Sequence, residues 1–272
     1  MTPDQTESCL KTALMLADIA GAVIRPLFRA PLHADNKADA SPVTVADRGA
    51  ERVMRAFLEE LHPDHGILGE EFGRTNADSP FCWTLDPVDG TRAFITGRPV
   101  FGTLIALMYE NRPVIGIIDQ PVTGERWIGV AGRETLFRPA MWHQDRTPLP
   151  AAARPCPSLG DAELSCTSPE MLESAPECFT WATLKQACRR VSWGGDCYAY
   201  GLLALGQIDI IAECDMKPWD WAALQPVVEG AGGCMTDWSG KPLDFNGDGT
   251  VLAVGNRDLL DKAVTSLKTA LH

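Results

Sequence analysis

The chain has 272 residues, of which 45% are hydrophobic and 22% charged, and its net charge is −12. The composition excludes wholesale disorder and collagen-like or coiled-coil chains, and the length suffices for one large domain or two smaller ones. The acidic balance, without a stripe of basic and aromatic residues, argues against partners such as nucleic acid or an anionic membrane. An anionic substrate would therefore need a bridging cation.

No apolar run is long enough to span a bilayer, and the N-terminus lacks the basic region of a secretory signal. The nine cysteines include no C-x-x-C pair, and several lie in apolar stretches. This pattern indicates buried, reduced thiols in a cytoplasmic protein rather than a disulfide framework or a zinc site. The five histidines show no metal-binding spacing.

The first half of the chain is predicted to contain two helices and then a strand-rich region. Apolar residues at helical spacing predict a helix over 4–28, and Thr44-Val-Ala-Asp47 resembles a capping box that opens a second helix ending near Leu61. The polar residues 32–43 between them are expected to form a loop. Strands are predicted at 66–69, 81–85, 102–109, 114–120, 126–131 and 134–138, the last four as antiparallel hairpins.

The second half shows a different pattern. Residues 139–160 are rich in Pro and Ala and lack periodicity, so we expect a linker that divides the chain into an α+β half, 1–145, and an α/β half, 146–272. Alternation of strands and helices follows this linker. The predicted strands are 163–166, 187–193, 208–213, 234–237 and 251–254, and the predicted helices are 169–179, 197–205, 221–231 and 259–271.

The densest candidate site is the run Asp86-Pro87-Val88-Asp89-Gly90-Thr91, which ends an apolar strand. Pro87 stiffens the turn, and Gly90 permits a tight backbone path. The N–H groups of Gly90 and Thr91 would then face outward at the start of a helix, which is typical of a phosphate-binding turn. The alternative is an ordinary Asx turn with a helix cap, and for an isolated D-x-x-D-G pattern this alternative is the more common.

Further acids strengthen the functional interpretation. Glu70 follows another short apolar strand, and Asp220 lies between two tryptophans. Asp47 and Asp220 have an alternative role as helix-capping acids, and Glu213 has one as a solvated strand end.

If Glu70, Asp86, Asp89 and Asp220 converge, their negative charges repel one another unless cations are present. Hard divalent cations with oxygen ligands remove this repulsion, and Mg²⁺ is the usual choice beside phosphate. A carboxylate cluster beside a phosphate-binding turn therefore predicts metal-assisted hydrolysis of a phosphate ester.

Three segments together resemble the signatures of the inositol monophosphatase superfamily. They are Gly69-Glu70-Glu71, the run from Trp83 to Thr91, and Trp219-Asp220. The match in order and separation extends from Lys37 and Thr44–Asp47 to Gly232-Gly233. The resemblance implies a five-layer αβαβα sandwich with the active site between its halves, a homodimer, and two or three Mg²⁺ ions.

The resemblance also implies roles for individual residues. One Mg²⁺ would be bound by Glu70, Asp86 and the carbonyl of Val88, and a second by Asp86, Asp89 and Asp220. Val88 stands where isoleucine is commoner, but only its carbonyl is used.

Other residues would then handle the water and the phosphate. Glu70 with Thr91 would orient the attacking water, and Asp47 would be an outer ligand or hold a water. Substrate phosphate would lie at Asp89, Gly90 and Thr91.

The stretch Trp193-Gly-Gly-Asp196-Cys197-Tyr-Ala-Tyr200 resembles the histidinol-phosphate phosphatase branch of this superfamily, as do residues 91–97 and 101–104. Inositol monophosphatases usually carry a small neutral residue where Asp196 stands. Histidinol phosphate carries an ammonium group that Asp196, with Glu213 nearby, would bind. Asp196 has an equally weighted alternative as the N-cap of helix 197–205.

Arg190 is a candidate contact to the phosphate, although it and Arg189 are equally compatible with a surface pair. The sequence therefore predicts a Mg²⁺-dependent histidinol-phosphate phosphatase of histidine synthesis. The alternatives are an inositol-1-phosphate or broad sugar-phosphate phosphatase, a 3′-phosphoadenosine nucleotide phosphatase, whose adenine-binding segment nothing here resembles, and a non-catalytic binding protein. The last alternative predicts loss of a metal-binding carboxylate, and all of these carboxylates are present.

Overall fold

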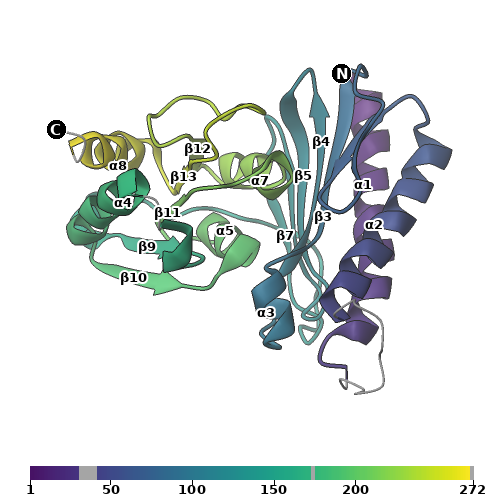
Figure 1. The fold of residues 1–272 in the computed structure, drawn as a ribbon, viewed down its shortest axis with the longest axis horizontal. Coiled ribbons are helices and arrows are strands. Elements are labelled where there is room, and N and C mark those ends of the chain that lie inside the picture. The colour runs from purple at the N-terminus through teal and green to yellow at the C-terminus, as the bar shows by residue number, and fades with distance from the viewer. Residues whose placement is uncertain (31–41, 173–174, 270–272) are drawn as a thin grey trace.

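The computed structural model describes residues 1–30, 42–172 and 175–269, which form five stacked layers (Figure 1). Helices α1 (Pro3–Ile24) and α2 (Pro42–Leu61) cover one face of a first sheet. Helices α5 (Asp196–Ala204) and α7 (Leu224–Gly230) pack between this sheet and a second one. Helices α4 (Ala175–Ala187) and α8 (Arg257–Thr269) cover the outer face of the second sheet. The αβαβα sandwich expected from the resemblance is confirmed.

In the described part of the chain the first sheet has eight strands in the order β2-β1-β3-β4-β5-β6-β7-β8. Its pairings are antiparallel except for β1 with β3, which are parallel. The 3₁₀ turn Arg25–Leu27 follows α1, and α3 (Thr91–Ile95) follows β3. The strands are β1 (Gly66–Gly69), β2 (Gly73–Thr75), β3 (Phe81–Asp89), β4 (Gly102–Tyr109), β5 (Arg112–Gln120), β6 (Glu125–Val130), β7 (Leu136–Arg138) and β8 (Leu149–Pro150).

The second sheet has five strands among the described residues, in the order β10-β9-β11-β13-β12. Strands β10, β9 and β11 are parallel, whereas β13 and β12 are added antiparallel. The short helix α6 (Pro218–Trp221) and the 3₁₀ turns Leu159–Asp161 and Pro169–Leu172 complete this half. The strands are β9 (Glu163–Cys166), β10 (Arg190–Trp193), β11 (Ile210–Glu213), β12 (Cys234–Thr236) and β13 (Val251–Val254).

Several predicted boundaries are wrong. Helix α2 begins at Pro42, so Thr44–Asp47 lies inside the helix and is not a capping box. Residues 169–179 are not one helix, because a 3₁₀ turn precedes α4, which continues to Ala187 and delays the next strand to Arg190. The helix predicted at 221–231 is divided into α6 and α7, and β8 forms inside the predicted linker. Most of the predicted loop 32–43 lies outside the described residues.

The two sheets draw on separate parts of the sequence, up to Pro150 and from Glu163 onward. The core between them is shared, because α5 and α7 contact both sheets. The division of the chain at residue 145 therefore stays a prediction. No helix among the described residues is both long and apolar enough to cross a membrane.

The middle helical layer touches the first sheet through glycines. Gly116 of β5 and Gly129 of β6 are direct cross-strand partners. A Cβ atom on Gly116 would overlap the carbonyl of Ala223, and one on Gly129 would overlap the backbone at Pro226. The backbone around the start of α7 thus lies directly against the sheet. Because Asp220 lies only three residues before Ala223, this contact sets how closely Asp220 approaches the sheet.

We expect Gly116→Ala to lower the free energy of unfolding by about 1–3 kcal/mol, because the added methyl group has to displace the start of α7. Urea unfolding measures this loss. Gly160→Ala is the matched control, since a Cβ there meets nothing nearer than Ser158 Oγ at 3.8 Å. Wild-type stability of Gly116→Ala would contradict a close-packed contact.

Candidate active site

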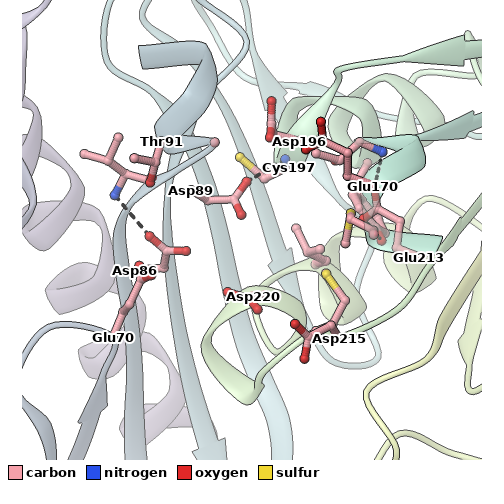
Figure 2. A pocket seen from close by; sticks show the side chains of 17 residues that line it. Glu70, Asp86, Asp89, Thr91, Glu170, Asp196, Cys197, Glu213, Asp215 and Asp220 are labelled. Atoms are coloured by element: carbon pink, nitrogen blue, oxygen red, sulfur yellow. Dashed lines mark hydrogen bonds between the residues drawn. The ribbon is translucent and has the colours of Figure 1, made fainter. Parts of the chain in front are cut away.

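Asp86 and Asp89 face the same side of β3 because the strand contains a bulge. In a regular strand, residues three apart point to opposite faces. Asp86 pairs with Leu104 of β4 and Asp89 pairs with Gly102, so three steps along β3 match two steps along β4. The extra residue on β3 reverses the alternation. It brings both carboxylates to the face that looks toward the middle helical layer (Figure 2).

The turn after β3 is held by its own hydrogen bonds. The Val88 N–H donates to Asp86 Oδ1 at 3.1 Å, so Asp86 forms the Asx-type contact considered as the alternative to a functional site. Gly90 follows with a φ of 89°, a left-handed conformation that favours glycine. Thr91 begins α3, and its hydroxyl lies 3.4 Å from the Val88 carbonyl. The local turn and the position in the site are therefore compatible.

Glu70 lies at the end of β1, on a turn held by a buried ion pair of α2. The Glu51 carboxylate accepts a hydrogen bond from the Glu71 N–H at 2.8 Å and from the next N–H at 3.2 Å. Arg55 donates to Glu51 at 2.6 Å and to the carbonyl of Gly73 at the far end of the turn. Both ends of the Glu70-bearing turn are thus fixed to the same helix.

Asp220 is the third residue of α6 and not the N-cap of a helix over 221–231, but its carboxylate does cap α6, so the capping role is confirmed at a different position. Its Oδ2 accepts a hydrogen bond from the N–H of Lys217 at 2.7 Å, an interaction that closes the first turn of the helix. The contact of the following residues with the first sheet places this carboxylate opposite β3 (Figure 2).

These elements enclose a cavity of about 280 Å³ between the two halves. Eight of its lining residues are acidic, and no Lys, Arg or His is among the described residues that line it. We call Glu70, Asp86 and Asp89 the sheet wall, and Thr167, Asp196, Tyr200 and Glu213 the far wall. The remaining lining residues are Val88, Gly90, Thr91, Glu170, Met171, Cys197, Asp215, Met216, Asp220 and Leu224.

The concentration of acids raises their pKa values. Burial, followed by repulsion from Glu70 and Glu71, raises the pKa of Asp47 to about 8. Burial raises the pKa of Asp220 to about 7, although the hydrogen bond from Lys217 opposes the shift. Burial and then repulsion by other carboxylates raise the pKa values of Asp86 and Asp89 well above the ordinary range. The site without cations is therefore electrostatically unfavourable.

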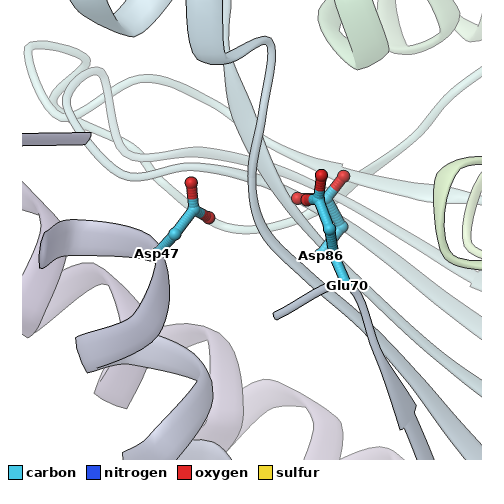
Figure 3. A group of neighbouring side chains, drawn as sticks. All are labelled: Asp47, Glu70 and Asp86. Carbon is cyan, nitrogen blue, oxygen red and sulfur yellow. The ribbon is translucent and has the colours of Figure 1, made fainter. Parts of the chain in front are cut away.

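A hard divalent cation fits this donor set. Carboxylate oxygens of Asp47, Glu70 and Asp86 lie within 4.8 Å of one another (Figure 3), and so do those of Asp86, Asp89 and Asp220. Asp47 Oδ1 is buried and has no hydrogen-bond partner among the described residues. Clustered carboxylate oxygens are the ligands that Mg²⁺ and Ca²⁺ prefer, and a bound cation would satisfy the unpaired oxygen.

The far wall holds two carboxylates, half-buried Asp196 and buried Glu213. Asp196 has a φ of 44° and packs against Gly90, where any side chain would collide with the Asp196 carboxyl. Its neighbour Cys197 donates its N–H to Asp89 Oδ2 at 2.6 Å. The N-cap of α5 is Gly195, so the capping alternative for Asp196 is wrong. Glu213 is only 3% exposed, so it is not a solvated strand end.

The structure does not bring Arg190 to this cavity. Its side chain is 65% exposed and donates to Glu163 of the neighbouring strand at 2.8 Å, so the expected contact with phosphate is corrected to a surface ion pair. Lys37 lies outside the described residues.

Sequence reasoning missed part of the cavity lining. Thr167 and Glu170 follow β9. Asp215 precedes the segment that carries Asp220, and Tyr200 lies on the same helix as Asp196. Acidity is the signal that could have found Glu170 and Asp215, and closeness to Asp196 the one for Tyr200, whereas Thr167 carries none.

The fold and the acidic cavity define a phosphatase built around metal-binding carboxylates, and comparison with known proteins agrees. The model of the inositol monophosphatase family matches residues 5–272. The chain is 42% identical to the chloroplastic bifunctional phosphatase IMPL2 of Arabidopsis thaliana over 93% of this chain and 73% of that protein. It is 35% identical to the histidinol-phosphatase of Chlorobaculum parvum over 93% of each chain.

A solved inositol monophosphatase from Zymomonas mobilis superposes with a TM-score of 0.87 and 47% identity, covering 96% of this chain and 98% of that one. The chain belongs to the inositol monophosphatase family, whose members are metal-dependent phosphatases.

We expect the metal-free protein to lose stability as the pH rises from about 5 to about 8. The pKa values of Asp47 and Asp220, about 8 and about 7, exceed the value of about 3.9 in an unfolded chain. The folded state therefore binds more protons than the unfolded state in this range, and stability falls as these protons are released.

Thermal melting with a chelator measures this, and Mg²⁺ should raise the melting temperature more at high pH, because metal and protons compete. A melting temperature independent of pH would contradict the expectation.

We expect Asp220→Asn to lower turnover by at least about 100-fold, since it removes one of the three carboxylates that together could hold a metal ion, the other two being Asp86 and Asp89. The same change should raise the melting temperature of the metal-free protein, because it relieves repulsion, and should reduce the gain produced by Mg²⁺. Exposed Asp78, which does not line the cavity, supplies the control Asp78→Asn. Turnover of Asp220→Asn at the level of that control would remove the metal-binding role of Asp220.

Proposed function

We propose that the protein is a Mg²⁺-dependent phosphatase that hydrolyses L-histidinol phosphate to L-histidinol and phosphate, a step of histidine biosynthesis. The observation that carries this proposal is the pair of carboxylates on the far wall, half-buried Asp196 and buried Glu213. Burial, and then repulsion from Glu213, raises the pKa of Asp196 to about 6. Arg98 and Arg92 oppose this rise from outside the cavity. The described lining itself contains no basic side chain, so a substrate ammonium group between these acids would bring a positive charge into the cavity.

The sheet wall supports the phosphatase chemistry. Glu70, Asp86, the Val88 carbonyl, Asp89 and Asp220 would hold two or three Mg²⁺ ions, and Asp47 would bind an outer ion or a water. Bound Mg²⁺ would neutralise the charge of the phosphate and lower the pKa of a bound water molecule. Glu70 and Thr91 would orient the attacking water, while Asp89, Gly90 and Thr91 would lie against the phosphate.

Similarity to the histidinol-phosphatase of Chlorobaculum parvum supports this substrate, as does the stretch around Asp196. The alternative is an inositol-1-phosphate or broad sugar-phosphate phosphatase, which is supported by the 47% identity to the Zymomonas mobilis inositol monophosphatase. The homodimer and the cytoplasmic location stay predictions from the sequence.

Phosphate release from histidinol phosphate and from inositol-1-phosphate, measured side by side with Mg²⁺ and with chelator, tests the proposal. We expect a strong preference for histidinol phosphate and no release with chelator. Asp196→Asn should reduce that preference by at least about tenfold, because it removes a hydrogen bond between two charged groups that is worth about 1.5–3 kcal/mol, while asparagine tolerates the left-handed backbone. A preference for inositol-1-phosphate in the wild-type protein would overturn the substrate and leave the phosphatase chemistry intact.

A further inference from the structure

Two buried donors hold the Glu213 carboxylate in one orientation. The hydroxyl of Tyr200 on α5 donates to Glu213 Oε2 at 2.8 Å, and the N–H of Thr167 donates to Oε1 at 2.6 Å. Tyr200 has no exposed surface, and Glu213 is 3% exposed. Each carboxylate oxygen therefore has one fixed donor, which leaves its other lone pairs as acceptors for a ligand in the cavity.

These contacts also affect the charge of Glu213. Burial raises the pKa of this carboxyl, whereas the hydrogen bonds from Thr167 and Tyr200 lower it. The hydroxyl of Tyr200 faces Glu213 and, farther away, Cys166 and Asp89, so nothing basic takes over its effect on that side. Without the hydroxyl, Glu213 Oε2 would lose its donor inside the protein, and the neutral carboxyl would be favoured.

We propose that Tyr200 is a positioning residue that makes the enzyme selective for a phosphate ester whose leaving group is a cationic amine, by keeping Glu213 oriented and charged. This inference rests on the proposed function. An ammonium group binds a charged carboxylate much more strongly than a neutral carboxyl. A substrate hydroxyl binds the charged and the neutral form nearly equally well. Loss of the Tyr200 hydroxyl should therefore weaken the binding of a cationic substrate more than the binding of a neutral one.

The chain offers a matched control on the same helix. Tyr198 is half-buried, and its hydroxyl donates to Glu125 Oε2 at 2.8 Å. Neither Tyr198 nor Glu125 lines the cavity. Tyr198→Phe and Tyr200→Phe thus delete the same kind of hydrogen bond, to a glutamate of β6 in one case and to Glu213 in the other.

The experiment compares kcat/KM for histidinol phosphate with kcat/KM for inositol-1-phosphate in the wild-type protein and in both variants. We expect the ratio to fall about tenfold in Tyr200→Phe, mainly through KM for histidinol phosphate, and to stay at the wild-type value in Tyr198→Phe. Competitive inhibition by free histidinol should weaken in parallel. Equal ratios in the two variants would overturn the role of Tyr200 while the substrate preference of the wild type stands.

A wild-type protein without a preference for histidinol phosphate would overturn the proposed function, and this inference with it. If Tyr200→Phe does not fold, Glu213→Gln and the double variant Tyr200→Phe/Glu213→Gln give the answer, since neither leaves a buried charge without its donor. Equal ratios in these two proteins are expected, because Tyr200 acts through the charge of Glu213. A further fall in the double variant would show that Tyr200 affects selectivity by another route.

Discussion

Repulsion among carboxylates is the constraint around which the centre of this molecule is built. The negative charges of three carboxylates repel one another, because each raises the energy of the charged form of the others; the three are Asp86, Asp89 and Asp220. The fold holds them together with interactions that involve no opposite charge in the described cavity lining. A cation that binds there relieves this repulsion and so stabilises the folded state. Metal binding and folding stability are therefore thermodynamically coupled.

These carboxylates are positioned by different structural features, each of which lies in the backbone or in residues outside the cavity. A bulge turns two residues of β3 to one face, an ion pair within α2 holds the turn with Glu70, and a glycine contact fixes the approach of Asp220. On the far wall, neutral donors of Thr167 and Tyr200 hold Glu213. The two walls have different proposed roles: the carboxylates of the sheet wall would bind metal ions beside the phosphate, and those of the far wall would bind the leaving group.

The sequence predicted what depends on local pattern. Helix α1 and the hairpin of β5 and β6 follow from periodicity and turn residues, and Asp220 was conspicuous as an acid between tryptophans. The bulge in β3 and the break between α6 and α7 depend on tertiary contacts that no local pattern encodes. Thr167 contributes a backbone N–H, which any residue has, and Arg190 was misplaced because its partner Glu163 lies on a neighbouring strand distant in sequence.

The glycine contact also limits how the cavity can change. Since backbone meets backbone at Gly116 and Gly129, no side chain can be shortened there to bring the start of α7 nearer the first sheet, and a larger residue has to displace α7 at a cost in stability. The dimension that the phosphate and its metal ions would occupy is thus tied to the stability of the fold. The far wall is built from side chains, so a different leaving group can be accommodated there without altering the reaction centre. The molecule separates a part of fixed size, where the bond is broken, from a part of adjustable shape, where the substrate is chosen.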